Sequence, residues 1–374
     1  MLPPNPLSIA THFESLADPR ISGKTEHKLL DIIVIAISGV ICHADDWVSI
    51  AQFGRAKEGW FRQFLELPNG IPSHDTFNRV FSRLSPTGFQ ACFASWVRAL
   101  SGAYDGLIAV DGKRLRGSYD RASDKSAIHL VSAWAVDNAL VLGQVKTNEK
   151  SNEITAIPQL LNLLALEGCL VTIDAMGCQK PIARQIIDQG GDYVLAVKGN
   201  QRGLYEQVLT AFETAENAEF KGYTVDTLKT QDQGHGRTEV RRYCVLATEG
   251  LLEAPNWVGL NMIGVVEAER TEHGKTRSEM RYYIGSIPPR AADFARAVRG
   301  HWHIENSLHW VLDVAFREDD CRVRKGYGAE NLAVLRHIAL NAAKQEKTAK
   351  LGVKNKRLRA GWDEPYLAKI LAGI

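Results

Sequence analysis

The sequence has few cysteines, and they form no paired motif. Its 374 residues include six cysteines, and no two of them make a CxxC pair. This argues against a zinc knuckle and a disulfide framework, and it is typical of a protein in a reducing cytosol. Hydrophobic residues make up 45% of the chain and charged residues 24%, as in ordinary globular proteins. We therefore expect a soluble cytoplasmic protein of two or three domains.

Long apolar segments are also missing. The most apolar early stretch runs from Leu29 to Cys42 and contains Asp31. A helix needs roughly 20 apolar residues to cross a bilayer, and this stretch is shorter. It also lacks the flanking residues of a signal peptide. The sequence therefore predicts no contact with a membrane.

A strong net charge is absent from the chain as a whole, but not from its C-terminal part. The formal net charge is +2. Residues 321–374 carry 12 Lys and Arg against 4 Asp and Glu, so the rest of the chain is net negative. A basic tail at residues 344–374 predicts a polyanionic partner. A solvated, disordered tail would have the same composition, and charge alone does not separate the two.

Apolar side chains in the first 105 residues recur at helical spacing. Ser73 is the expected N-cap of one helix. This pattern predicts an all-helical N-terminal domain, residues 1–105. A helix–turn–helix over residues 50–84 is an alternative, but residues 1–105 hold 9 basic and 10 acidic side chains, and DNA readers usually show a basic face. The expected helices cover residues 26–48, 50–65, 73–84 and 86–100.

Three apolar strands that follow residue 105 each end on a charged side chain. They cover residues 107–110, 168–173 and 192–197, and are followed by Asp111, Asp174 and Lys198. Because Asp111 precedes a glycine, it could simply begin a turn. Three such residues in one sheet are harder to attribute to turns, since ligands of open α/β sheets bind at the carboxyl ends of strands.

The expected elements from residue 106 onward are three strands, a helix, a strand, a helix and a strand. The second and third strands, residues 128–136 and 140–146, read as an antiparallel meander with the first. This order is the layout of a ribonuclease H-like core, in which the first and fourth strands are neighbours about 4.8 Å apart. We expect this mixed-sheet α/β core to comprise residues 106–221 and 288–343.

The core is interrupted by a segment of alternating strands. Strands at residues 239–247, 261–269 and 278–284 predict a β-rich insertion over residues 222–287. A long helix from Pro289 then passes beyond Trp310. It carries Glu305 on a face of aromatic and aliphatic side chains, so we expect this acid to be buried and to need a partner.

Asp111, Asp174 and Glu305 are the candidate catalytic and metal-binding residues. Adjacent strands would bring the two aspartates together, and the helix would place Glu305 against the same edge. Three crowded carboxylates cannot all ionise unaided. Two Mg²⁺ ions about 3.5–4 Å apart would relieve the repulsion and assist in-line phosphoryl transfer. Mn²⁺ is an expected substitute.

Five stretches of the chain form a specific combination: residues 70–77 (GIPSHDTF), 109–113 (AVDGK), 172–176 (TIDAM), 193–200 (YVLAVKGN) and 301–310 (HWHIENSLHW). Together they resemble one known family, the H-repeat-associated, ISAs-type insertion-sequence transposases of the DDE superfamily. The similarity covers almost the whole chain. It implies that Asp111, Asp174 and Glu305 are a metal-binding catalytic triad, with a β-domain inserted between the second and third acids.

One part of the family pattern is missing. Related transposases carry Tyr, Arg and Lys seven and four residues before and seven after the glutamate, where this chain has Val298, His301 and Leu312. Phosphate binding is therefore expected elsewhere. The three histidines His301, His303 and His309 suggest a zinc site as an alternative, but His301 and His303 are two residues apart and point away from each other on a helix, which disfavours it. The candidate DNA-binding residues are Lys113, Lys198, Asn200, Arg237, Arg299, His301 and His309.

The resemblance implies a bacterial insertion-sequence transposase that cuts element ends and joins them to target DNA. Its expected partners are double-stranded DNA and a second copy of the chain in a synaptic complex. Its expected location is the cytoplasm, at the nucleoid. The alternatives are an inactive or domesticated relative that only binds DNA, and a cellular nuclease or junction resolvase on the same core. The nuclease would need neither the N-terminal domain nor the insertion.

Overall fold

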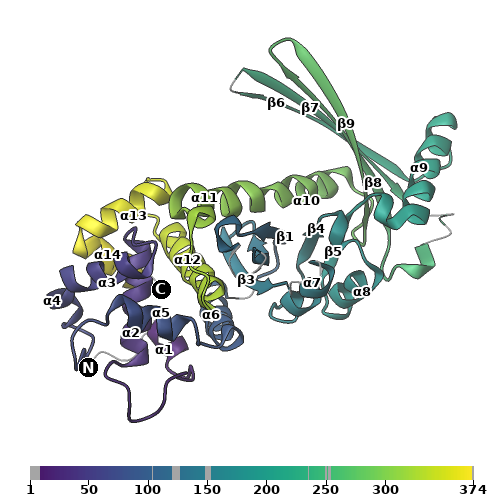
Figure 1. The fold of residues 1–374 in the computed structure, drawn as a ribbon. Helices are drawn as coiled ribbons and strands as arrows, with labels where there is room; N and C mark the ends of the chain where they lie inside the picture. Colours follow the sequence, from purple (N-terminus) through teal and green to yellow (C-terminus); the bar gives the residue numbers. More distant parts are fainter. Residues whose placement is uncertain are drawn as a thin grey trace.

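The structure is a computed structural model, and it has a mixed α/β fold with one large sheet (Figure 1). It describes residues 9–102, 104–119, 127–147, 153–234, 236–248, 251 and 254–372. Within those ranges, no helix has both the length and the apolar character needed to span a bilayer.

Helices make up the regular structure described before the first strand. α2 (Leu29–Ile41) is rich in Ile and Val and is buried along nearly its whole length, because α3 and α12 pack against it. α5 (His74–Phe81) begins at the predicted N-cap, where the Ser73 hydroxyl accepts a hydrogen bond from the Thr76 N–H at 3.2 Å. The other helices here are α1 (Ile9–Phe13), α3 (Trp47–Ala56), α4 (Glu58–Phe61) and α6 (Pro86–Ser101).

The sheet has the strand order β3-β2-β1-β4-β5-β9-β8-β7-β6. β1, β4 and β5 are parallel to one another, and every other pairing is antiparallel. The predicted neighbours, the first and fourth strands, pair with Val110 opposite Ile173. The strands are β1 (Leu107–Arg114), β2 (His129–Ala135), β3 (Leu140–Lys146), β4 (Leu170–Ile173), β5 (Asp192–Val197), β6 (Val225–Gly234), β7 (Arg237–Ala247), β8 (Met262–Glu272) and β9 (Lys275–Gly285).

β1 is longer than the apolar run that predicts it. The expectation that this strand ends at Asp111 was wrong, because pairing with β2 continues to Arg114 and places Asp111 opposite Ser132. Backbone hydrogen bonds to β2 satisfy these residues whatever their side chains are. β4, in contrast, stops at Ile173. Asp111 therefore lies just where β1 loses one of its two neighbours.

Residues 222–287 extend the core sheet instead of forming a separate one. β9 pairs with β5, with Val194 opposite Gly285, and β8, β7 and β6 follow outward. β6 was not expected, because most of its side chains are exposed and show no buried face. The outer ends of these strands project away from the rest of the sheet (Figure 1).

One long helical segment crosses the sheet and carries Glu305. It consists of α10 (Ala291–Ile304), a π turn (Glu305–His309) and α11 (Trp310–Phe316), so the predicted single helix is interrupted. Gly300 of α10 faces Leu107, and a Cβ at that position would collide with the leucine side chain. The opposite face is covered by α7 (Glu153–Leu161) and α8 (Lys180–Asp188) (Figure 1).

Residues 344–372 are folded and do not form a detached arm. α13 (Val353–Trp362) and α14 (Glu364–Ala372) pack against α12 (Gly328–Gln345) and α2. Arg357 has no exposed surface. Its guanidinium donates to the Val40 carbonyl at 2.8 and 3.1 Å and pairs with Asp45 at 2.5 Å. Lys356 is also buried, so the expectation that both cations belong to a phosphate-binding tail was wrong.

One further helix, α9 (Arg202–Asn217), follows β5 and was not expected from the sequence.

Replacing Arg357 by methionine is expected to destabilise the fold by about 3–5 kcal/mol, because it leaves the buried end of the Asp45 carboxylate without its partner. The measurement is urea unfolding. Arg359→Met is the matched control, since Arg359 is exposed and pairs with Asp363 across one helical turn at 3.4 Å; it should cost about 1 kcal/mol or less. Equal losses in the two variants would contradict a structural role specific to Arg357.

Candidate active site

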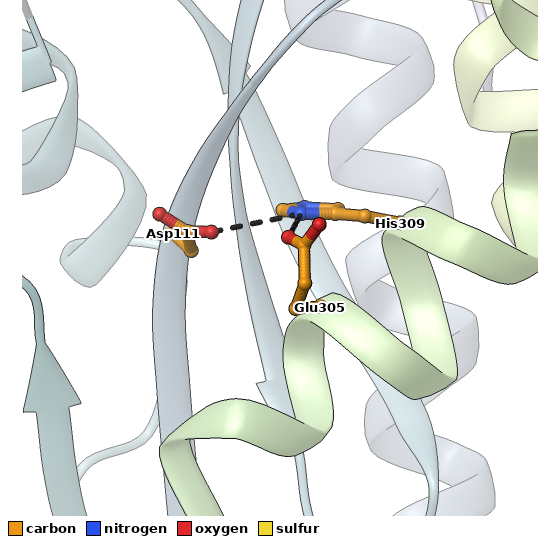
Figure 2. A group of neighbouring side chains, drawn as sticks. All are labelled: Asp111, Glu305 and His309. Atoms are coloured by element: carbon orange, nitrogen blue, oxygen red, sulfur yellow. Dashed lines mark hydrogen bonds and ion pairs between the residues drawn. The ribbon is translucent and has the colours of Figure 1, made fainter. Parts of the chain in front are cut away.

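The structure brings Asp111, Glu305 and His309 together (Figure 2). One ligand atom from each residue lies within 4.8 Å of the other two. The His309 Nδ1 atom is 3.1 Å from a Glu305 carboxylate oxygen and 3.6 Å from an Asp111 oxygen. The group therefore joins β1 to the π turn of the helix that crosses it.

The π turn is accompanied by a local side-chain hydrogen bond. The Asn306 side chain donates to the Trp302 carbonyl at 3.1 Å, so a side-chain amide bonds a carbonyl that an α-helix would give to a backbone N–H. The extra residue in the turn changes which side chains share a face. Such turns occur frequently at functional sites.

Glu305 is more exposed than expected. Its side chain is 56% exposed, whereas that of His309 is 5% exposed. The prediction that Glu305 is buried was wrong, because its side chain lines an open cavity. The need for a partner was right: a hydrogen bond from His309 lowers the pKa of Glu305, against a smaller opposing effect of burial.

Asp111 lies in a more acidic and more buried setting. Burial raises the pKa of Asp111 to about 6, and the charges of Asp174 and Glu153 add to this effect while His309 opposes it. Burial and the charge of Glu153 also raise the pKa of Asp174. The acids that crowd Asp111 are thus Asp174 and Glu153, whereas the sequence predicted Asp174 and Glu305.

Asp174 occupies the start of the turn that follows β4. Its carboxylate accepts a hydrogen bond from the Met176 N–H at 3.0 Å. It lines a cavity of about 410 Å³ together with Asp111 and Glu305, but it is not among the three residues whose ligand atoms lie closest. Asn200 donates to the Ala175 carbonyl at 2.6 Å, so this candidate DNA contact holds the Asp174 turn.

Glu153 is a nearby acid that sequence reasoning missed. It begins α7 and pairs with His129 of β2 at 2.7 Å. A Cβ on Gly112 would collide with both side chains, so the glycine after Asp111 leaves room for them. Neither a strand end nor a helix face in the sequence pointed to Glu153.

The comparisons with known proteins show the family of this chain. The family description "Transposase DDE domain" matches residues 103–342, and "DDE_Tnp_1-associated" matches residues 10–97. This chain belongs to the DDE transposase family. The resemblance to H-repeat-associated transposases is confirmed by an H repeat-associated relative, YhhI of Escherichia coli (strain K12), which is 43% identical over 97% of both chains.

Two further likenesses extend along most of the chain. YncI of Escherichia coli O157:H7 is 42% identical over 98% of this chain and 94% of its own. A piggyBac transposase synaptic complex with hairpin DNA matches 94% of this chain and 75% of that chain, with 11% identity and a TM-score of 0.42. That last likeness is too low to carry an argument.

Membership of this family implies a divalent cation, and the residues present are suited to one. Carboxylate oxygens are the ligands that hard divalent cations prefer, and Asp111 and Glu305 supply them within the 4.8 Å cluster. His309 is a further possible ligand. Among the described residues, this is the one group of His, Cys, Asp and Glu found close enough to hold a metal ion; His301 and His303 are not part of it.

Lys113 is not available as a DNA contact in this conformation. Its side chain is 11% exposed, and its ammonium bonds Asp313 at 2.5 Å and Glu318 at 3.0 Å. His309 is likewise buried, with Nδ1 directed at the two acids (Figure 2). The DNA-binding roles predicted for these two residues would require both to leave their present partners.

His301 is a partly buried residue of α10 that faces β4 and lines the acid cavity. Its Nδ1 is 3.2 Å from the Thr172 hydroxyl, and burial lowers the pKa of His301 to about 4. It is therefore neutral near pH 7 and offers no charge to a phosphate. Val298 and Leu312, which stand where related transposases have Tyr and Lys, are also buried.

The remaining predicted DNA-binding residues are exposed. Lys198 lines the acid cavity. Arg237 and Arg299 line a separate groove of about 860 Å³ between the β7–β9 ribbon and α10. That groove adjoins the acid cavity, because both are lined by Arg281, Val298 and Trp302.

A neutral, partly buried His301 is expected to weaken the fold in acid. The unfolded chain binds a proton at His301 near pH 6.5, but the folded chain does so only near pH 4. Stability should therefore fall as the pH drops between these values, by up to about 3 kcal/mol. Urea unfolding of His301→Gln should show a smaller fall between pH 7 and pH 4.5. His337 is also buried and has a pKa lowered to about 4, so some acid loss should remain. A variant curve parallel to wild type would show that other groups cause the loss.

Proposed function

We propose that this protein is an active DNA transposase that nicks element ends and transfers the freed strand to target DNA by metal-dependent in-line phosphoryl transfer. The observation that carries the proposal is the cluster of Asp111, Glu305 and His309 within 4.8 Å. It stands at a cavity that Asp174 also lines, in a chain of the DDE transposase family.

Asp111 and Glu305 would hold the cation, with Asp174 completing the ligand set from the other strand. We infer Mg²⁺, which Mn²⁺ can replace, because the donors are mainly carboxylate oxygens. When bound, it would stabilise the charge on the attacking and leaving oxygens. His309 orients Glu305 through their 3.1 Å hydrogen bond. Lys198 is exposed beside Asp174, where it could bind a phosphate.

We propose a ribonuclease H-like core for residues 106–221 and 288–343. What supports it is the order β3-β2-β1-β4-β5, with an antiparallel β1–β3 unit and parallel β1, β4 and β5. Residues 1–105 would be the helical N-terminal domain, with residues 344–374 packed beside it. Residues 222–287 would be a β-rich extension of the core sheet.

The groove beside the acid cavity is the proposed path for DNA. Seven Lys and Arg side chains line it against three Glu, so a polyanion is favoured there. Arg237 and Arg299 are the predicted contacts among them. The cations that line the groove are Arg237, Arg241, Arg270, Lys275, Arg277, Arg281 and Arg299.

The proposed partners are double-stranded DNA, both terminal repeats and target, and a second copy of this chain. Two element ends must be cut for one insertion, so two sites in a synaptic dimer would serve them. The proposed location is the cytoplasm, at the nucleoid. An inactive or domesticated relative that only binds DNA is the alternative, and the presence of all three acids argues against it.

Substitution of each triad acid by its amide is the direct test. Asp111→Asn, Asp174→Asn and Glu305→Gln should each lower nicking and strand transfer by at least about 10²–10³-fold, the scale expected when charge stabilisation is removed from a site. Binding to terminal-repeat DNA should persist. The measurement is cleavage of DNA from the flanks of this gene, with and without Mg²⁺.

The matched control for the triad is Asp320→Ala, because Asp320 is exposed and pairs only at the surface, with Arg317 at 3.1 Å. It should cleave like wild type. Glu318, close by in sequence, is unsuitable because it is fully buried and paired with Lys113. Wild-type rates in all three amide variants would refute the proposed chemistry.

The groove is tested by removing two of its cations. Arg237→Ala with Lys275→Ala should weaken DNA binding at every sequence and flatten the plot of log affinity against log salt by about 0.9 per lost contact. Arg202→Ala with Lys221→Ala is the control, since it removes two exposed cations outside the groove. Equal effects of the two pairs would mean that the groove is not the DNA path.

A further inference from the structure

A buried charged network lies beside the acid cluster, and the proposed chemistry does not use it. Its centre is Lys113, two residues after Asp111 on β1. Residues two apart on a strand extend from the same face. An acid of the site and a cation that is 11% exposed therefore face the same helical segment.

The Lys113 ammonium has three donors and three acceptors around it. They are the His309 carbonyl at 3.3 Å, the Asp313 carboxylate at 2.5 Å and the Glu318 carboxylate at 3.0 Å. The acceptors come from the π turn, from α11 and from the 3₁₀ turn Glu318–Asp320. One side chain of β1 thus contacts three successive parts of the segment that carries Glu305.

The network is anchored on its far side. Glu318 is 2% exposed and also pairs with Arg336 of α12 at 3.6 Å. Burial alone would lower the pKa of Lys113, but the Glu318 and Asp313 carboxylates raise it, so the lysine remains charged at neutral pH. Its three bonds are therefore charge-assisted, which makes them stronger than neutral ones.

The arrangement is better suited to positioning the neighbouring turn than to stabilising the fold. Buried ion clusters are often no more stabilising than apolar packing of the same volume. Here, however, the bonded carbonyl belongs to His309, whose ring contacts both Asp111 and Glu305. Lys113 thus bonds the backbone carbonyl of His309, while Asp111 contacts the ring of the same histidine.

We propose that Lys113 is a positioning residue that holds the Glu305–His309 turn against β1 and keeps Asp111 and Glu305 close enough to share one divalent cation. The inference rests on the proposed function only in that these two acids bind a cation. It excludes a direct DNA contact by Lys113, because the ammonium would have to leave all three acceptors.

The test is a charge-balanced double variant, Lys113→Met with Asp313→Asn, which removes one positive and one negative charge and keeps the Glu318–Arg336 pair. It should unfold in one cooperative transition and bind DNA with the affinity and salt dependence of wild type. Its affinity for Mn²⁺, measured by electron paramagnetic resonance on the protein without DNA, should fall about 10–100-fold, as for other groups that orient metal ligands. Cleavage should recover in part at high Mn²⁺.

Arg114→Met is the matched control, since it removes the next cation on β1, which is exposed, and should leave Mn²⁺ affinity unchanged. If the double variant does not fold, Asp313→Asn alone should lower Mn²⁺ affinity by a smaller factor. Two outcomes would overturn the positioning role of Lys113 and leave the proposed function intact. One is an unchanged Mn²⁺ affinity in the folded variants. The other is a salt dependence of DNA binding that falls by one contact in the double variant but not in Asp313→Asn. Wild-type protein that binds no Mn²⁺ would overturn the proposed function and this inference with it.

Discussion

The close contact between β1 and the helical segment that crosses it is the constraint on which the acid cluster depends. α10 can approach Leu107 as it does because Gly300 has no side chain at the crossing point. Five residues further along, the π turn directs Glu305 back toward Asp111, and His309 lies between the two carboxylates. The third acid, Asp174, depends on a different element, the parallel pairing of β4 with β1. Packing of a helix and register of a sheet are thus both needed to assemble one site.

Local patterns were sufficient to predict the strands that precede Asp111 and Asp174. Buried strands appear as short apolar runs, so the strands before Asp111 and Asp174 could be found and placed side by side. The N-cap at Ser73 was equally visible, because a cap involves residues three apart. The pairing of acids from distant parts of the chain came from the order of elements, together with the family resemblance. The roles of Asp111, Asp174 and Glu305 as metal ligands stay predictions.

What the sequence did not reveal depends on partners far along the chain. Lys113 and Arg357 look like solvated or DNA-binding cations, since their acceptors Asp313 and Asp45 are 200 and 312 residues away. The π turn was missed because helical periodicity assumes an uninterrupted α-helix. β6 was missed because both its faces are largely polar or exposed, so it has no alternation. For Lys113 and Arg357 the deciding contact is tertiary, and no window of neighbouring residues contains it.

The continuity of the sheet has a mechanical consequence. Because β9 is hydrogen-bonded to β5, the β6–β9 ribbon is joined to the strand next to β4 through backbone bonds and not through a flexible linker. A ribbon mounted in this way cannot rotate freely about its base. If DNA lies in the groove beneath the ribbon, the angle between the groove and the acids is fixed before the DNA binds. The DNA, and not the protein, must then deform to fit that angle. Sequences that bend or unstack easily would then be favoured without any contact to their bases.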